Sequence, residues 1–251
     1  MKTKALERFF AAHPKLALGF SGGVDSSFLL HFASQLSVDV APYFVKTAFQ
    51  PAFELEDARA VAEFSKATLR VIEVDVLDHP LVAYNGPDRC YHCKAAIFSR
   101  IREVAACEGC KVLIDGTNAS DDAGDRPGMR ALQELGVLSP LRLCELTKKD
   151  VRALSLEAGL FTHDKPAYSC LATRIRTGET ITAARLAVIE AAERFLFSLG
   201  LGDLRVRTSG ADATIQLPES QMAQLLAARR EIVDEFASLG FGSVVLDLVP
   251  R

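Results

Sequence analysis

No apolar run in this 251-residue sequence approaches the roughly eighteen residues that a membrane-spanning helix needs. The sequence also lacks an excess of basic residues, because 29 Lys and Arg stand against 32 Asp and Glu, for a net charge of −3. The global basic field that is typical of nucleic-acid-binding proteins is therefore missing. The first apolar stretch, residues 16–20, is too short for the apolar region of a signal peptide. We expect a cytoplasmic protein with no membrane and no nucleic-acid partner.

Apolar runs that suit buried strands alternate with helical patterns through the first two-thirds of the chain. The strands are expected at residues 15–20, 38–45, 70–76 and 111–114, and the helices at 26–35, 55–66 and 94–106. Alternation of this kind predicts an α/β fold, with a parallel sheet that carries helices on both faces. Ligands of such sheets bind beyond the carboxyl ends of the strands.

The pattern changes after Gly178, where short strands and long helices follow one another. Helices are expected at residues 183–199 and 221–239, and strands at 204–208, 214–217 and 243–249. This predicts a small α+β domain over residues 179–251, behind a nucleotide-binding domain over residues 1–178. The small domain could serve as a substrate clamp and also as a surface for a homo-oligomer.

A glycine-rich loop ends the first strand and opens the first helix, with the sequence Ser21-Gly22-Gly23-Val24-Asp25-Ser26-Ser27. Backbone N–H groups and the helix dipole attract phosphate in this geometry, and glycines allow a close approach to an anion. The three serines can add hydroxyl donors, and Asp25 is placed to hold a Mg²⁺ ion that bridges phosphate oxygens. No Gly-Lys-Ser/Thr follows, so this is not a Walker A loop. The competing interpretation is a tight turn with Ser26 as a helix cap.

Strand, SGGxDS loop and helix in that order resemble the PP-loop superfamily, also called the N-type ATP pyrophosphatases. The resemblance implies a PP-loop (adenine nucleotide alpha hydrolase-like) domain whose loop binds the pyrophosphate of ATP. It also implies an enzyme that adenylates an oxygen of its substrate and releases pyrophosphate. The ATP contacts expected in the loop are Ser21, Gly22, Gly23, Asp25, Ser26 and Ser27.

Six cysteines ask for a chemical explanation in a protein expected to stay in a reducing compartment. Cys90 and Cys93 form a CxxC pair at the start of a predicted helix, and Cys170 lies in an irregular stretch. A helix N-terminus and nearby arginines lower the pKa of a thiol, so these three are candidate thiolates. A CxxC pair with one distant cysteine would hold three irons of a [4Fe-4S] cluster and leave the fourth open.

A second CxxC, Cys107 with Cys110, raises the alternative of a four-cysteine zinc site. The two pairs flank one predicted helix, and a dozen helical residues already span roughly 18 Å. The pairs therefore should not share a metal. Cys107, Cys110 and Cys144 are more simply small buried or half-buried residues.

Several motifs together resemble the LarE family of sulfur transferases, over residues 15 to about 214: Asn85-Gly86-Pro87-Asp88-Arg89-Cys90-Tyr91-His92-Cys93-Lys94, Asp115-Gly116-Thr117-Asn118, Arg126-Pro127-Gly128 and Cys170-Leu171-Ala172-Thr173-Arg174. The family builds the nickel-pincer nucleotide cofactor of lactate racemase. The resemblance implies that ATP adenylates a carboxylate of pyridinium-3,5-biscarboxylic acid mononucleotide. A sulfur nucleophile then displaces AMP to leave a thiocarboxylate.

The family uses two sulfur sources, and both stay open here. In one, the cysteine that matches Cys170 attacks, gives up its sulfur and becomes dehydroalanine. In the other, three cysteines hold a [4Fe-4S] cluster whose open iron carries hydrosulfide. Because Cys90 and Cys93 accompany Cys170, the sequence favours the cluster.

Pairs of arginines supply the expected substrate contacts. Arg205 and Arg207 alternate on a predicted strand and share one face, which suits an anion clamp as well as a solvated surface. The resemblance places the substrate phosphate on this pair. Arg174 matches the family motif beside Cys170, and Arg176 is added from its spacing. We assign catalytic roles to Asp25, Cys170 and Arg174.

An acidic and polar turn ends the fourth predicted strand at Asp115. An Asp-Gly turn would explain it without a ligand, but the resemblance favours nucleotide contacts from Gly116 and Thr117. Three further aspartates are weaker candidates for metal or substrate contacts, namely Asp121, Asp122 and Asp125.

Three rival functions remain. A tRNA-thiolating PP-loop enzyme shares the ATP chemistry and a three-cysteine cluster, but it should present a broad basic surface. A synthetase that uses ammonia leaves the three cysteines without a task. A non-catalytic zinc scaffold needs the zinc site that the helix length opposes.

Overall fold

The computed structural model describes residues 2–121 and 127–251, and the chain packs as two compact units. The first unit comprises Met1–Val76 and Asp88–Lys165, and the second comprises Leu77–Pro87 and Pro166–Arg251. The domain division expected after Gly178 stays a prediction. In the part of the chain that the structure describes, no helix has both the length and the apolar character needed to cross a bilayer.

The sheet of the first unit is parallel throughout, as predicted. Its strands lie in the order β3-β2-β1-β4 and comprise β1 (Lys15–Gly19), β2 (Asp39–Lys46), β3 (Arg70–Glu73) and β4 (Val112–Ile114). Strand β3 is shorter than expected because its partner β2 ends at Lys46, which pairs with Glu73. The next residues turn into a short 3₁₀ helix, η1 (Val76–Asp78).

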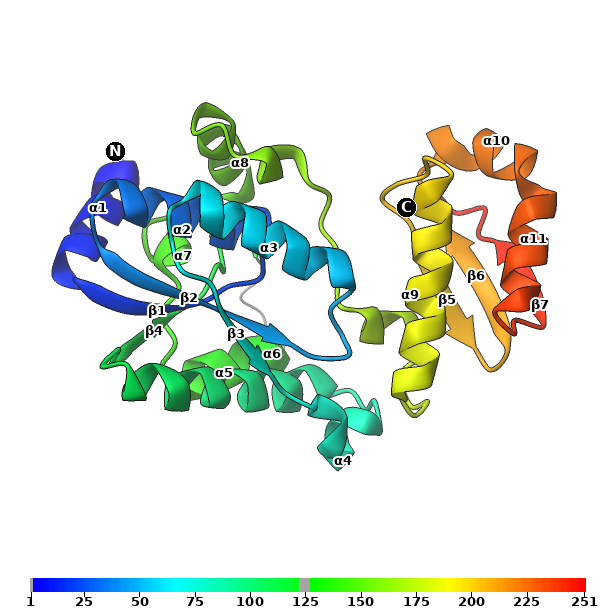
Figure 1. Cartoon of the computed structure of the whole chain (residues 1–251), viewed down its shortest axis with the longest axis horizontal. Coiled ribbons are helices and arrows are strands. Elements are labelled where there is room, and N and C mark those ends of the chain that lie inside the picture. The colour runs from blue at the N-terminus through cyan, green and yellow to red at the C-terminus, as the bar shows by residue number, and fades with distance from the viewer. Residues whose placement is uncertain (1, 122–126) are drawn as a thin grey trace. The chain divides into compact units, whose positions relative to one another are not determined.

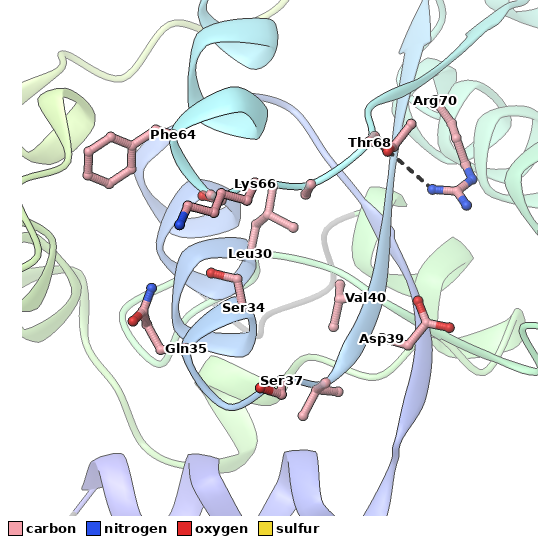
Figure 2. Close-up of a pocket in the computed structure, with 13 residues that line it drawn as sticks. Leu30, Ser34, Gln35, Ser37, Asp39, Val40, Phe64, Lys66, Thr68 and Arg70 are labelled. Atoms are coloured by element: carbon pink, nitrogen blue, oxygen red, sulfur yellow. Dashed lines mark hydrogen bonds between the residues drawn. The ribbon is translucent and has the colours of Figure 1, made fainter.

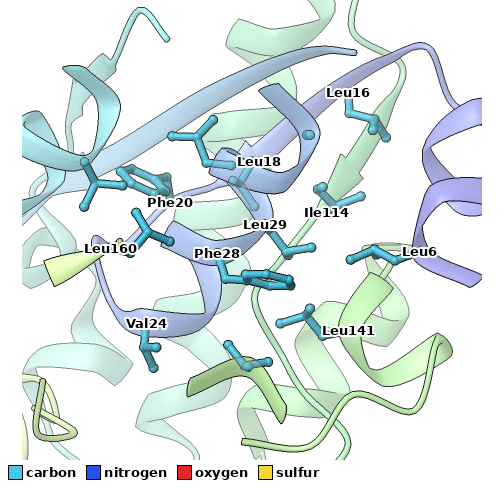
Figure 3. Close-up of a cluster of buried hydrophobic side chains, with 14 of the residues drawn as sticks. Leu6, Leu16, Leu18, Phe20, Val24, Phe28, Leu29, Ile114, Leu141 and Leu160 are labelled. Carbon is cyan, nitrogen blue, oxygen red and sulfur yellow. The ribbon is translucent and has the colours of Figure 1, made fainter. Parts of the chain in front are cut away.

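Helices cover both faces of this sheet (Figure 1). One face packs on five helices: α1 (Lys2–Ala12), α2 (Val24–Gln35), α3 (Ala52–Phe64), α7 (Pro140–Leu143) and α8 (Lys148–Glu157). The 3₁₀ helix η2 (Phe161–Asp164) follows α8. The other face packs on α5 (Arg89–Cys107) and α6 (Pro127–Glu134). Side chains of β1 alternate between the two cores, with Leu16 and Leu18 on the first and Ala17 on the second. Figure 3 shows Leu18, Phe28 and Ile114 among the side chains of the first core.

The order of the strands indicates where along the carboxyl ends of the sheet a ligand should bind. Strand β1 pairs with β2 on one side and β4 on the other. The helix that leaves β1 (α2) and the helix that precedes β4 (α5) lie on opposite faces. The helices that connect β1 to β2 and β3 to β4 thus cover different faces, and β1 and β4 flank a topological switch point, where α/β sheets bind ligands.

The second unit has a three-stranded sheet in the order β5-β6-β7. Strands β5 (Arg205–Ser209) and β6 (Asp212–Gln216) are antiparallel, whereas β6 and β7 (Ser243–Leu246) are parallel. Its helices are α4 (Pro80–Ala83), η3 (Leu171–Arg174), α9 (Ala183–Ser198), α10 (Glu219–Ala227) and α11 (Arg229–Ser238). This mixed sheet with helices agrees with the predicted small α+β fold.

One helix prediction in this unit is wrong. Residues 221–239 form two helices rather than one, and α10 and α11 meet at Ala228, whose backbone (φ −88°, ψ 7°) leaves the helical region. The break lets both Leu225 and Ile232 reach the core of the second unit. No glycine or proline marks it in the sequence, so tertiary packing overrides local helix propensity here.

Candidate functional site

The backbone of the loop between β1 and α2 is shaped for an anion. Gly22 has φ +70°, and a Cβ atom there would lie 3.0 Å from the backbone nitrogen of Ala58, so only glycine fits without strain. Gly23 is the N-cap residue of α2, and no side chain among the described residues caps this helix end. The first N–H groups of α2 are thus left for a ligand.

The serines of this loop differ in what they can offer. The Ser26 hydroxyl donates to the Gly23 carbonyl at 3.2 Å and accepts from the Ser21 N–H at 3.3 Å, so it braces the loop. Ser26 is thus not a conventional helix cap. Ser27 is fully buried, and its N–H donates to the Gly23 carbonyl. Ser21 is exposed and is the serine best placed to reach a bound phosphate.

Asp25 lies where three segments of the first unit converge. Its carboxylate accepts a hydrogen bond from Asn118 Nδ2 at 3.2 Å and an ion-paired hydrogen bond from Lys148 Nζ. The side chain is 18% exposed, and this burial is the largest cause that raises the pKa of Asp25 above its ordinary value. The nearby Lys148 acts in the opposite direction. A partly exposed carboxylate beside free N–H groups suits a hard cation that carries phosphate.

Lys148 is a candidate site residue that the sequence analysis missed. It is the first residue of α8, behind a capping box in which Thr147 and Asp150 hydrogen-bond to each other's backbone. Its own N–H donates to Ser120 Oγ at 3.0 Å. A cation in the first turn of a helix is disfavoured by the helix dipole, so a lysine there needs an anionic partner. That unfavourable position was the signal available in the sequence.

The turn after β4 supports the loop more than it offers free groups. Asp115 is buried, and it accepts hydrogen bonds from Thr117 Oγ1 at 2.5 Å and Ser139 Oγ at 2.7 Å. A Cβ atom on Gly116 would lie 3.0 Å from the Ser26 nitrogen, so glycine allows the two loops to approach. Asp121 accepts from the Asn118 N–H at 2.9 Å, while Asp122 and Asp125 lie outside the described residues.

The CxxC pair of the first unit opens α5. Cys90 is exposed and Cys93 is half-buried, and their i, i+3 spacing places both thiols on one side of the helix. The guanidinium of Arg89 donates to Cys90 Sγ at 3.4 Å. Tyr91 anchors this turn on α6, because its hydroxyl donates to Glu134 at 2.6 Å and Arg130 lies 4.5 Å above its ring.

The two CxxC pairs lie at opposite ends of α5. Nineteen helical residues span about 28 Å, so the four cysteines cannot share one zinc ion, which confirms the prediction. Cys110 and Cys144 are buried as predicted, and burial raises the pKa of both thiols, whereas the same prediction is wrong for Cys107, which is exposed at the end of α5. Among the residues that the structure describes, no group of three or more His, Cys, Asp and Glu side chains is arranged to hold a metal ion. The predicted cluster set draws Cys90 and Cys93 from the first unit and Cys170 from the second, and it stays a prediction.

A group of arginines in the second unit lies near residues 169–174, which contain Cys170 and the 3₁₀ helix η3 and are called the Cys170 turn below. Arg205 Nε is buried and has no hydrogen-bond partner among the described residues. Burial lowers the pKa of Arg205, and the positive charges of Arg251, Arg174 and Arg207 lower it further. Glu193 acts in the opposite direction. A buried guanidinium nitrogen without a partner, close to other positive charges, suits an anionic ligand. Arg207 is exposed and hydrogen-bonds to Gln216 at 2.7 Å.

Arg174 and Arg176 take different positions. Arg174 is fully buried, and its guanidinium pairs with Glu193. Arg176 is exposed, and its backbone carbonyl accepts a hydrogen bond from Asn85 at 2.9 Å. The sequence treated both as substrate contacts, but only Arg176 has a side chain that solvent reaches.

No family model matches the chain. The chain is 33% identical to the pyridinium-3,5-bisthiocarboxylic acid mononucleotide synthase of Lactiplantibacillus plantarum over 236 residues, which cover 93% of this chain and 86% of that protein. This chain belongs to the LarE family. It is also 34% identical to an uncharacterized protein of Synechocystis over 98% of this chain and 93% of that protein. An uncharacterized protein of Methanocaldococcus jannaschii is 30% identical over 99% of this chain and 94% of that protein.

A cavity of about 620 Å³ in this LarE-family protein lies away from the candidate site. Figure 2 shows Leu30, Val40, Lys66 and Arg70 among the residues that line it. It is formed where α2 and α3 end and where β2 and β3 begin, at the opposite end of the strands from the loop between β1 and α2. It contains none of the residues predicted for ATP, substrate or cluster.

Proposed function

We propose that this LarE-family protein is an ATP-dependent sulfur transferase that converts a carboxylate of pyridinium-3,5-biscarboxylic acid mononucleotide into a thiocarboxylate. The observation that carries the proposal is the shared length and identity with the synthase of Lactiplantibacillus plantarum. The uncapped loop between β1 and α2, with Asp25 and Lys148 beside it, supports the ATP step. The proposal predicts AMP and pyrophosphate in equal amounts, only when the mononucleotide is present.

The adenylation step uses the first unit. Backbone N–H groups of the loop and the Ser21 hydroxyl would bind the β- and γ-phosphates. Asp25 would hold Mg²⁺, which when bound neutralises charge on the phosphate oxygens. Lys148 would move from Asp25 to the phosphates. A substrate carboxylate oxygen attacks the α-phosphorus of ATP, the bond to the β-phosphate oxygen breaks, and pyrophosphate leaves.

The sulfur step replaces AMP. A sulfur nucleophile attacks the carbonyl carbon of the acyl adenylate, and the bond from that carbon to the AMP oxygen breaks. With Cys170 as the nucleophile, loss of its α-proton and cleavage of its C–S bond then leave dehydroalanine and the thiocarboxylate. With a cluster, Cys90, Cys93 and Cys170 would hold three irons, and the group would supply hydrosulfide when bound. The pair on one side of α5 fits two of these ligands.

The phosphate of the mononucleotide fits the arginines of the second unit. Arg205 Nε is a buried donor without a partner, and Arg207 lies two residues along the same strand. Both guanidiniums can donate hydrogen bonds to phosphate oxygens. Arg176, which is exposed, is the better placed of the two remaining arginines to contact a carboxylate.

Lys148→Met should raise the KM for ATP by about 10- to 100-fold, because a hydrogen bond to a charged group contributes roughly 1.5–3 kcal/mol. It should also move the acid limb of the adenylation pH profile to higher pH. Lys148 lowers the pKa of Asp25, so its removal raises that pKa and Asp25 loses its charge at a higher pH. Pyrophosphate release measured against pH and ATP concentration checks both effects. Lys149→Met, at the exposed neighbouring position, is the matched control, and equal effects in both variants would contradict the assignment.

Arg205→Ala with Arg207→Ala should raise the KM for the mononucleotide by about 100-fold or more, because two charge-assisted contacts are lost. Binding of Mg²⁺-ATP should be nearly unchanged, since the ATP residues belong to the other unit. Calorimetric titration with each ligand checks the split. The exposed pair Arg229 and Arg230, changed together to alanine, controls for loss of positive charge in the same unit. Equal loss of both ligands would assign Arg205 and Arg207 to folding or to the ATP site.

A further inference from the structure

A buried ion pair lies directly behind the Cys170 turn. Arg174 Nε donates to Glu193 Oε1 at 2.7 Å, and Arg174 Nη2 donates to Glu193 Oε2 at 3.1 Å. Each side chain is only 1% exposed. This two-point geometry fixes the guanidinium plane as well as its position.

The arginine end of the pair holds the backbone around Cys170. Arg174 Nη1 donates to the Ser169 carbonyl at 2.9 Å, to Ser169 Oγ at 2.8 Å and to Thr173 Oγ1 at 3.0 Å. Its guanidinium also lies 4.5 Å from the centre of the Tyr168 ring. The residues before and after Cys170 therefore wrap around one buried side chain.

The glutamate end of the pair holds the strand that carries the arginines. Glu193 Oε1 accepts from the Val206 N–H at 2.9 Å, and Val206 stands between Arg205 and Arg207. The Tyr168 hydroxyl donates to Glu193 Oε2. A second hydrogen bond joins β5 to the Cys170 turn, because Arg207 Nη1 donates to the Thr173 carbonyl at 3.1 Å.

Stability alone is a poor reason for such a pair. Removing two charges from water is costly, and buried ion pairs are often replaceable by apolar residues without loss of stability. The Arg174 guanidinium donates its hydrogen bonds to Glu193 and to the residues on either side of Cys170, Ser169 and Thr173. We therefore expect the pair to fix the local geometry rather than to add to the stability of the fold.

We propose that Arg174 and Glu193 are positioning residues, which hold Cys170 at a fixed separation from the Arg205 and Arg207 strand. This proposal rests on the proposed function. The substrate would be bound by its phosphate on the strand, and sulfur would arrive at Cys170, so the pair sets the distance between the two. Arg174 then acts through the turn and does not itself touch the substrate.

The test separates position from folding with two variants. Arg174→Met leaves the Glu193 charge buried without its partner, and it should lower the Tm strongly. Adding Glu193→Gln removes that charge, while the new amide oxygen can still accept from the Val206 N–H and the amide NH₂ can donate to the Tyr168 hydroxyl oxygen. The double variant should therefore recover most of the Tm. Its single-turnover rate of thiocarboxylate formation should stay at least about tenfold below that of the unchanged protein, with pyrophosphate release unchanged.

The half-exposed pair of Arg185 and Glu179, 2.7 Å apart in the same unit, supplies the control Glu179→Gln, which should change neither rate. Recovery of both Tm and sulfur transfer in the double variant would show a merely structural pair and overturn the proposal. A raised KM for the mononucleotide with an unchanged rate of sulfur transfer would also overturn it, by assigning Arg174 to substrate binding. If the double variant does not fold, Glu193→Gln alone is measured instead. Its rate of thiocarboxylate formation should then be at least about tenfold below that of the unchanged protein, with pyrophosphate release unchanged.

Hydrogen exchange at residues 169–174 keeps this proposal distinct from the function. Exchange of these amides should speed up at least tenfold in the double variant but not in Glu179→Gln. If the unchanged protein released no pyrophosphate, the proposed function would fail, and the exchange result would still decide whether the pair holds the turn. Unchanged exchange would overturn the pair's role even in an active enzyme.

Discussion

Asp25→Ala protein is expected to release almost no pyrophosphate, with a loss of about a thousandfold or more. The carboxylate lies beside the free N–H groups of α2 and is the group in this loop that can hold Mg²⁺. Without it, the ion that offsets phosphate charge loses its anchor, and several kcal/mol of transition-state stabilisation are lost. The measurement is pyrophosphate release with saturating mononucleotide and ATP.

Two comparisons make this result specific. Asp25→Asn keeps the shape of the side chain and can still form hydrogen bonds, but it lacks the negative charge. If that charge is what holds Mg²⁺, the rate of pyrophosphate release should fall nearly as far as in Asp25→Ala. Asp39→Ala, at the opposite edge of the sheet, should leave the rate within about twofold. Near-normal adenylation by Asp25→Ala would remove Asp25 from the ATP site.

Removal of any one of Cys90, Cys93 and Cys170 is expected to abolish a bound cluster. Anaerobic reconstitution of the unchanged protein should give about four irons per chain, and each of the three alanine variants should give far less. The reason is that each of the three thiolates binds one iron, so each substitution removes one of the three protein ligands. Iron content and the visible absorption spectrum are the measurements.

The other three cysteines provide matched controls. Cys107 lies at the far end of α5 from the CxxC pair, and Cys110 and Cys144 are buried. Alanine at any of these positions should leave the iron content unchanged. Iron-free protein that forms thiocarboxylate once and then carries dehydroalanine at position 170 would contradict the cluster and establish Cys170 as the sulfur donor.

The sequence predicted the parts of this protein that depend on local patterns. Short apolar runs between helical patterns predicted the parallel sheet, and two glycines before a helix predicted the tight turn between β1 and α2. The length of one helix was enough to exclude a shared zinc site. The predicted small α+β fold also followed from its own pattern of elements.

Other features depend on contacts between distant residues and could not be predicted in this way. Lys148 meets Asp25 across 123 positions, and only the position of a lysine at a helix start hinted at it. Arg174 was predicted as a substrate contact from its motif, because nothing in the sequence showed that Glu193 would bury it. The break at Ala228 carries no local signal at all, since core packing and not chain stiffness produces it.

The most direct test of the central claim is the mass of the mononucleotide after reaction. Pyridinium-3,5-biscarboxylic acid mononucleotide is incubated with Mg²⁺-ATP and the reconstituted protein, with and without added sulfide, and the products are analysed by mass spectrometry. The account predicts that one carboxylate oxygen is replaced by sulfur, with one AMP and one pyrophosphate released per sulfur transferred. Hydrolysis of ATP to AMP and pyrophosphate that leaves the mononucleotide unchanged, or no reaction with this mononucleotide, would contradict it.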